Sequence, residues 1–157
     1  MAQRQVPAGW RRRSRTVGPG RVSHGPALGL YSRVMPDVIF ERIAPVVTVH
    51  DLDAALTRYR RLGFATEVYA PARYGFAERG GVQLHLVQDD PDDPGGTGGV
   101  VYVYVSDADA LRADWAAAGV EGRFMGPHDT PYGLREFVYT DPDGIVHKVG
   151  SPLTDTL

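Results

Sequence analysis

The feature that most constrains the fold of this 157-residue sequence is an internal repeat. The segment Val47–Ala54 (VTVHDLDA) is similar to Val103–Ala110 (VYVSDADA), which begins 56 residues later. The same offset carries Gly63 onto Gly119. Each copy therefore predicts a strand, an aspartate that caps the next helix, an amphipathic helix and a glycine at the helix C-terminus.

The rest of each copy predicts three shorter strands. Apolar residues at helical spacing give each helix a buried face: Leu52, Leu56 and Tyr59 in the first copy, Leu111 and Trp115 in the second. The strands are expected near residues 65–69, 73–78 and 82–87, and then near 121–125, 134–140 and 145–149. Gly80-Gly81 and Asp141–Gly144 supply hairpin turns. The second copy has about seven extra residues, which we place in a loop from Gly126 to Gly133 that includes His128.

This pattern predicts an α+β fold made of two βαβββ modules. Module one spans residues 41–88, a polar linker spans 89–98, and module two spans 99–151. One module of about 50 residues buries too little surface to be stable alone. We therefore expect a single domain, 35–157, with a curved mixed sheet, helices on the outside and a concave cleft inside.

Residues 1–34 differ from the rest of the chain. They contain seven arginines and no acidic residue, with many glycines and prolines and no sustained periodicity, which predicts disorder. We interpret this extension as a start codon assigned too early, with Met35 as the true start. A basic nucleic-acid-binding tail and an export signal are the alternatives, although no adequate apolar segment follows the arginines.

Charge and composition exclude several classes of function. The remaining 123 residues hold ten of the 17 basic residues and all 19 acidic ones, a formal charge of −9. This acidic body disfavours binding to nucleic acid and favours a cationic ligand. No apolar run approaches the roughly 20 residues that span a bilayer, so we expect no membrane contact. Cysteine is absent, which excludes disulfides and thiolate chemistry and is typical of a cytoplasmic protein.

Strand alternation indicates which side chains face the cleft. Leu84 and Leu86 should pack under the helices, so His85 points the other way. The four positions at which an enzyme of this shape would hold a divalent metal are Ala44, His85, Val100 and Lys148. Two aliphatic residues and a lysine cannot complete a metal site. We therefore expect no metal, no cofactor and no catalytic residues, with His85 as a hydrogen-bonded residue of the wall.

Aromatic side chains are the chemical feature that the cleft does offer. The candidates are Tyr69, Tyr74, Phe76, Tyr102, Tyr104 and Tyr132, the last of which precedes Gly133. Cross-strand packing explains any single tyrosine equally well. The group as a whole predicts that a flat heteroaromatic molecule binds between the rings.

Several motifs resemble one known family, the bleomycin resistance proteins of the vicinal oxygen chelate (glyoxalase-like) superfamily. The resemblance covers Ile43–Gly150. It begins in Ala44–Val47, Asp51 and Leu62–Phe64, and continues in Val101–Val105, Asp109–Leu111 and Trp115. The most specific element is Pro131–Phe137 (PYGLREF), followed by Asp141–Gly144 (DPDG).

The resemblance implies a non-enzymatic homodimer that binds a bleomycin-type antibiotic and so confers resistance. It implies two clefts between the subunits and N-terminal strands exchanged at Pro45. The ring-stacking aromatics of the family fall on Tyr74, Tyr102 and Tyr132, where the family often has Trp or Phe. The full set of predicted ligand-binding residues is Tyr69, Tyr74, Phe76, His85, Tyr102, Tyr104, Tyr132 and Gly133.

Two other functions remain open from the sequence. One is a metal-dependent lyase, thiol transferase or dioxygenase of the same fold, which would need a ligand set that the sequence does not reveal. The other is a carrier for a different planar metabolite. The roles of Arg135 and Glu136 within the PYGLREF element are also open.

Overall fold

The computed structural model describes residues 39, 41–69, 73–90, 92 and 95–153. The predicted disorder and the proposed start at Met35 lie outside these residues. Module one contains β1 (Val46–Val49), α1 (Leu52–Arg61), β2 (Ala65–Tyr69), β3 (Tyr74–Arg79) and β4 (Val82–Gln88). Module two contains β5 (Gly99–Tyr104), α2 (Ala108–Ala117), β6 (Arg123–Asp129), β7 (Leu134–Thr140) and β8 (Ile145–Pro152).

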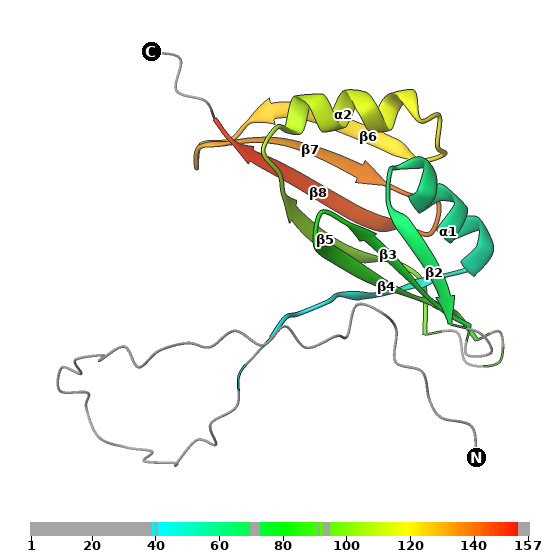
Figure 1. The fold of residues 1–157 in the computed structure, drawn as a ribbon. Coiled ribbons are helices and arrows are strands. Elements are labelled where there is room, and N and C mark those ends of the chain that lie inside the picture. The colour runs from blue at the N-terminus through cyan, green and yellow to red at the C-terminus, as the bar shows by residue number, and fades with distance from the viewer. Residues whose placement is uncertain (1–38, 40, 70–72, 91, 93–94, 154–157) are drawn as a thin grey trace. The chain divides into compact units, whose positions relative to one another are not determined.

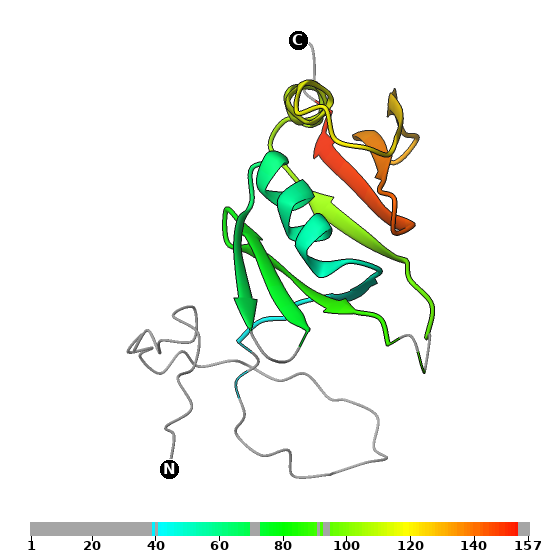
Figure 2. The same ribbon diagram turned by 90° about the vertical axis from the view of Figure 1, so that its right-hand side faces the viewer.

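The two modules have the same topology, which confirms the α+β fold of two βαβββ units. Their strands form two four-stranded sheets, ordered β1-β4-β3-β2 and β5-β8-β7-β6 (Figure 1). In each sheet the first pair of strands is parallel and the other two pairs are antiparallel. Helix α1 contacts the strands of the first sheet, and α2, viewed end-on in Figure 2, contacts those of the second.

The repeated helix signals act as the sequence predicts. The side chains of Asp51 and Asp107 cap α1 and α2 by accepting hydrogen bonds from the amides of Ala54 and Ala110. Gly63 and Gly119 follow the helices with φ of +85° and +61°, a conformation that a side chain would strain.

One prediction about module two is wrong. Strand β6 continues through most of the predicted loop, so the β6–β7 turn contains only Thr130–Gly133, and His128 lies in a strand. A bulge between Met125 and His128 absorbs Gly126 and Pro127, after which pairing with β7 resumes. Glycine and proline next to each other indicate a loop, but a β-bulge can accommodate both without ending the strand.

The two modules share one core. Tyr59 of α1 and His147 of β8 are both buried, and the Tyr59 hydroxyl lies 2.9 Å from His147 Nε2. Trp115 of α2 donates from Nε1 to the carbonyl of Leu62 in module one at 3.1 Å. Its ring packs edge-on against those of His147 and Phe137. Burial of these rings therefore requires both modules at once.

A buried ion pair holds the Asp141–Gly144 turn against α1. The guanidinium of Arg58 pairs with the Asp143 carboxylate and lies 3.7 Å from the Asp141 carboxylate. Asp141 Oδ1 accepts from the amides of Asp143 and Ile145, and Asp143 Oδ1 accepts from the amide of His50. The turn thus fixes the start of β8 to module one.

Burial of His147 makes stability depend on pH. Desolvation lowers the pKa of His147 from 6.5 to about 4. Between these values the unfolded chain binds a proton that the folded chain does not, so stability falls as the pH falls from 6.5 towards 4. The shift predicts a loss of about 3 kcal/mol over this range, measurable by urea unfolding at several pH values.

Two variants separate the contribution of His147 to this pH dependence from the contributions of other titrating groups. His147→Gln should flatten the dependence of unfolding free energy on pH between 6.5 and 4, whereas the exposed His128→Gln should not. An equal slope in wild type and His147→Gln would contradict this assignment.

Candidate ligand-binding face

Alternation along the central strands separates a core face from an open face. Leu84 and Leu86 of β4 are buried, and His85 lies between them on the other face. Val101 of β5 is buried, whereas Tyr102 and Tyr104 are 38% and 72% exposed. These directions agree with those expected from the sequence, and the role of these residues in binding a ligand stays a prediction.

Three rings form an aromatic wall on module one, here called the module-one wall: Tyr74, Phe76 and His85. Their centroids are 4.9–5.7 Å apart in edge-on geometry. Tyr74 Oη lies 2.8 Å from His85 Nδ1, and Gln83 Oε1 lies 3.2 Å from His85 Nε2. Desolvation, with the nearby positive charge of Arg42, lowers the pKa of His85, so its ring is neutral at neutral pH. His85 is therefore a hydrogen-bonded residue of the wall, as predicted.

A second cluster lies on module two and centres on a carboxylate. Glu136 Oε1 accepts hydrogen bonds from the hydroxyl of Tyr102 at 2.5 Å and from that of Tyr132 at 2.9 Å. The rings of Tyr102 and Tyr104 are 4.7 Å apart. Glu136 is only 7% exposed, whereas Tyr132 is 65% exposed. We call this group, Tyr102, Tyr104, Tyr132 and Glu136, the tyrosine–carboxylate cluster.

The tight β6–β7 turn positions Tyr132 at this cluster. The amide of Thr130 donates to the carbonyl of Leu134 at 2.8 Å, and the carbonyl of Gly133 accepts from the amide of Leu153 at 3.0 Å. Gly133 has a φ of +82°, which favours glycine at this position. The turn is thus held at both ends, and the Tyr132 side chain projects from its tip to reach Glu136.

Gly150 makes room for Tyr102. Strand β8 lies between β5, which carries Tyr102, and β7, which carries Glu136. Gly150 pairs with Glu136 in the register of β7 and β8, and a β-carbon at Gly150 would collide with the Tyr102 hydroxyl. Tyr102 can therefore cross β8 only because residue 150 has no side chain.

The hydrogen bonds keep the cluster in one protonation state. The hydrogen bond from Tyr102 is the main cause that lowers the pKa of Glu136, against the opposing effect of burial. Burial and the Glu136 contact raise the pKa of Tyr102, and the hydrogen bond to Glu136 raises that of Tyr132. At neutral pH Glu136 is therefore an anion held by two neutral tyrosine hydroxyls.

The four positions considered for a metal are not paired with one another in the sheet registers. Ala44 lies before the start of β1, and Val46 is the residue paired with His85. Tyr102, rather than Val100, is paired with Lys148. Within the described part of the chain, no three His, Cys, Asp or Glu residues are grouped so that they could hold a metal ion.

The helices of the described residues are too short or too polar to span a bilayer.

The remaining predicted residue, Tyr69, lies beside the module-one wall. It pairs with Tyr74 in the register of β2 and β3 and is 46% exposed. Among the described residues, no ring contact or hydrogen bond joins the module-one wall to the tyrosine–carboxylate cluster. The two groups belong to separate sheets.

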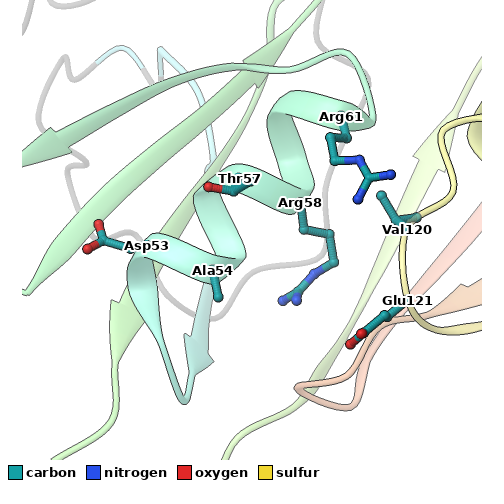
Figure 3. A pocket seen from close by; sticks show the side chains of 7 residues that line it. All are labelled: Asp53, Ala54, Thr57, Arg58, Arg61, Val120 and Glu121. Atoms are coloured by element: carbon teal, nitrogen blue, oxygen red, sulfur yellow. The ribbon is translucent and has the colours of Figure 1, made fainter.

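Two pockets are also present, one apart from these clusters and one that is lined in part by Tyr104. One, of about 410 Å³, is lined by Asp53, Ala54, Thr57, Arg58, Arg61, Val120 and Glu121 (Figure 3). Its arginines are already engaged, because Arg58 pairs with Asp143 and Arg61 donates to the carbonyls of Ala118 and Gly119. The other, of about 610 Å³, opens between Val82 and Leu111, and Tyr104 is the predicted ligand-binding residue that lines it.

Comparison with known proteins identifies the family. The family model for the Glyoxalase/Bleomycin resistance protein/Dioxygenase superfamily matches residues 40–148. The chain therefore belongs to this superfamily. No curated protein sequence gives a significant match.

Three solved structures illustrate the range of similar folds. A bleomycin resistance determinant encoded on transposon Tn5 is 20% identical with a TM-score of 0.63, covering 73% of this chain and 100% of that one. A bleomycin-binding protein from bleomycin-producing Streptomyces verticillus, complexed with copper(II)-bleomycin, is 26% identical with a TM-score of 0.58, covering 71% and 96%. A glyoxalase-related enzyme from Clostridium phytofermentans is 19% identical with a TM-score of 0.61, covering 76% and 100%.

Sequence reasoning did not assign a role to Glu136 or Gly150. Alternation around the buried Phe137 and Tyr139 does place Glu136 on the open face of β7. Its burial and its two tyrosine partners come from β5 and from the β6–β7 turn, and no local pattern in the sequence indicates these contacts. The need for glycine at position 150 is apparent only from the structure, in which Tyr102 crosses β8 to reach Glu136.

Substitution of Gly150 tests how the cluster is held together. Gly150→Ala should displace Tyr102 from Glu136 and lower the free energy of unfolding by about 1–3 kcal/mol in urea titrations. Gly95→Ala is the matched control, because a β-carbon at Gly95 meets no atom within 4 Å. Equal stabilities of the two variants would show that Tyr102 does not depend on Gly150.

Proposed function

We propose that this protein binds and sequesters a planar, cationic antibiotic of the bleomycin type without altering it, and so confers resistance. The observation that carries the proposal is the pair of aromatic clusters on the open faces of the two modules. The rings of the tyrosine–carboxylate cluster are accessible, with Tyr104 72% and Tyr132 65% exposed, and those of the module-one wall are half-buried. Similarity to a bleomycin resistance determinant and to a protein complexed with copper(II)-bleomycin supports the choice of ligand class.

The protonation states of the clusters favour binding over catalysis. His85 is neutral and contacts hydrogen-bonding partners at both ring nitrogens, which leaves no free nitrogen to act as a base. The lowered pKa of Glu136 makes that carboxylate a weak base. The proposed protein needs no cofactor, and we expect it to act in the cytoplasm.

We further propose that two copies form a homodimer with the ligand clefts between them. The segment before β1 supports an exchange at Pro45, because Ile43 is 94% exposed and Val46 is 58% exposed. The carbonyl of Pro45 accepts from the amide of His85 at 2.9 Å, so the chain is anchored just after this segment. A second copy would bring the module-one wall of one chain to the tyrosine–carboxylate cluster of its partner.

An enzyme of the same fold is the alternative. Its support is the likeness to a glyoxalase-related enzyme, which concerns the fold alone. A stoichiometric divalent ion in the purified protein, detected by elemental analysis, would favour a metal-dependent lyase, thiol transferase or dioxygenase.

Calorimetric titration with metal-free and copper-loaded bleomycin tests the proposed function. We expect saturable binding of two drug molecules per dimer, with the drug recovered unchanged by mass spectrometry. Tyr102→Ala and Tyr132→Ala should each weaken binding by about tenfold through lost ring contacts. Val68→Ala is the control, because Val68 is 47% exposed but lies on the opposite face of β2 from Tyr69.

The outcomes separate the parts of this proposal. Absence of binding at high micromolar drug would exclude bleomycin as the ligand and direct a screen to other planar antibiotics and metabolites. Full affinity in either tyrosine variant would remove that tyrosine from the site.

The N-terminal extension gives an independent test. Deletion of residues 1–34 should change neither the dimeric state, determined by analytical ultracentrifugation, nor the affinity for the drug, because the acidic body contains both clusters. A truncated protein that sediments as a monomer, or that binds more weakly, would assign a role to the extension.

A further inference from the structure

Glu136 is a buried carboxylate that lacks a positively charged partner. It is 7% exposed, and both of its hydrogen bonds are made to Oε1 by tyrosine hydroxyls. Across the described residues, no Lys, Arg or His nitrogen lies within 4.0 Å of its oxygens, and no group donates to Oε2. Oε2 is not among the fully buried side-chain atoms that lack a partner, so this oxygen is open to solvent. Glu136 is therefore an anion with unused capacity to accept.

Two tyrosine hydroxyls contact this anion on the open face, and a third tyrosine ring lies next to one of them. Tyr102 and Tyr132 hold the carboxylate through their hydroxyls, and the ring of Tyr104 lies 4.7 Å from that of Tyr102. Ring faces attract cations, and the attraction grows where water is partly excluded. A carboxylate among tyrosine rings is the combination of groups that binds an organic ammonium ion.

We propose that Glu136 and the rings of Tyr102, Tyr104 and Tyr132 form a subsite for the ammonium group of the ligand. This inference rests on the proposed function for the identity of the ligand-binding face. In this arrangement the neutral module-one wall binds the planar part of the ligand. The tyrosine–carboxylate cluster binds its positively charged group.

Lys148 is the charged residue that opposes this role. It is exposed on the same face and pairs with Tyr102 and Val138 in the sheet register. Its charge acts on Glu136 without forming an ion pair. His128 pairs with Glu136 in the register of β6 and β7. It is another basic group whose charge lowers the pKa of Glu136. A ligand cation must therefore compete with the field of Lys148, and removal of that charge should strengthen cation binding.

The experiment compares two small probes of equal shape, choline and its uncharged carbon isostere 3,3-dimethylbutan-1-ol. Binding to the full-length protein is measured from amide chemical shifts of Gly133 and Gly150 at constant pH and ionic strength. We expect choline to bind about tenfold more tightly than the alcohol. Glu136→Gln should abolish this preference, because the amide keeps an oxygen for the two tyrosine hydroxyls but loses the charge.

Lys148→Gln tests the same subsite by removing a positive charge instead of a negative one. It should increase the preference for choline, whereas a purely structural role of Glu136 predicts no effect of Lys148 on either probe. Urea unfolding of each variant checks that the fold is kept. Equal affinities for the two probes, no choline binding, or a preference that survives Glu136→Gln would each overturn the subsite.

The result is independent of the bleomycin titration. Discrimination between the probes without bleomycin binding would keep the ammonium subsite and reject the named drug. Bleomycin binding without discrimination would keep sequestration and reject the subsite.

Discussion

The structure depends on one aromatic core that neither module can form alone. Tyr59 and Leu62 come from module one, and Trp115 and His147 from module two, and hydrogen bonds join them across the boundary. Because the helices and the core occupy one face of each sheet, the other face is left to solvent. The open faces that carry the aromatic clusters are therefore a consequence of how two small modules bury their apolar surface together.

Equivalent positions in the two modules carry side chains that differ in charge and in size. The sheet registers place Tyr74 of module one at the position of Glu136 in module two, and His85 at that of Lys148. Val46 likewise corresponds to Tyr102. Module one thus presents two neutral rings and a valine where module two presents a carboxylate, a lysine and a tyrosine. A ligand bound to both faces as proposed would meet one apolar surface and one charged surface, which would fix its direction.

The repeat made most of the fold predictable. Asp51 with Asp107 and Gly63 with Gly119 mark the helix ends by local chemistry, and the structure places all four as expected. The end of β6 was not predictable in this way, because Gly126 and Pro127 indicate a loop until the pairing with β7 is known. Local pattern decides caps and turns, whereas a bulge depends on the neighbouring strand.

The candidate site was only half predictable for the same reason. Alternation fixed the directions of His85, Tyr102 and Tyr104, but the Tyr102–Glu136 hydrogen bond crosses an intervening strand and requires Gly150. That contact changes how the site is understood. Tyr102 and Tyr132 donate their hydroxyl protons to Glu136, so their rings are held in place and their oxygens are occupied. The groups left accessible are the ring surfaces and the second oxygen of the carboxylate, and the proposed ammonium subsite is built on these groups.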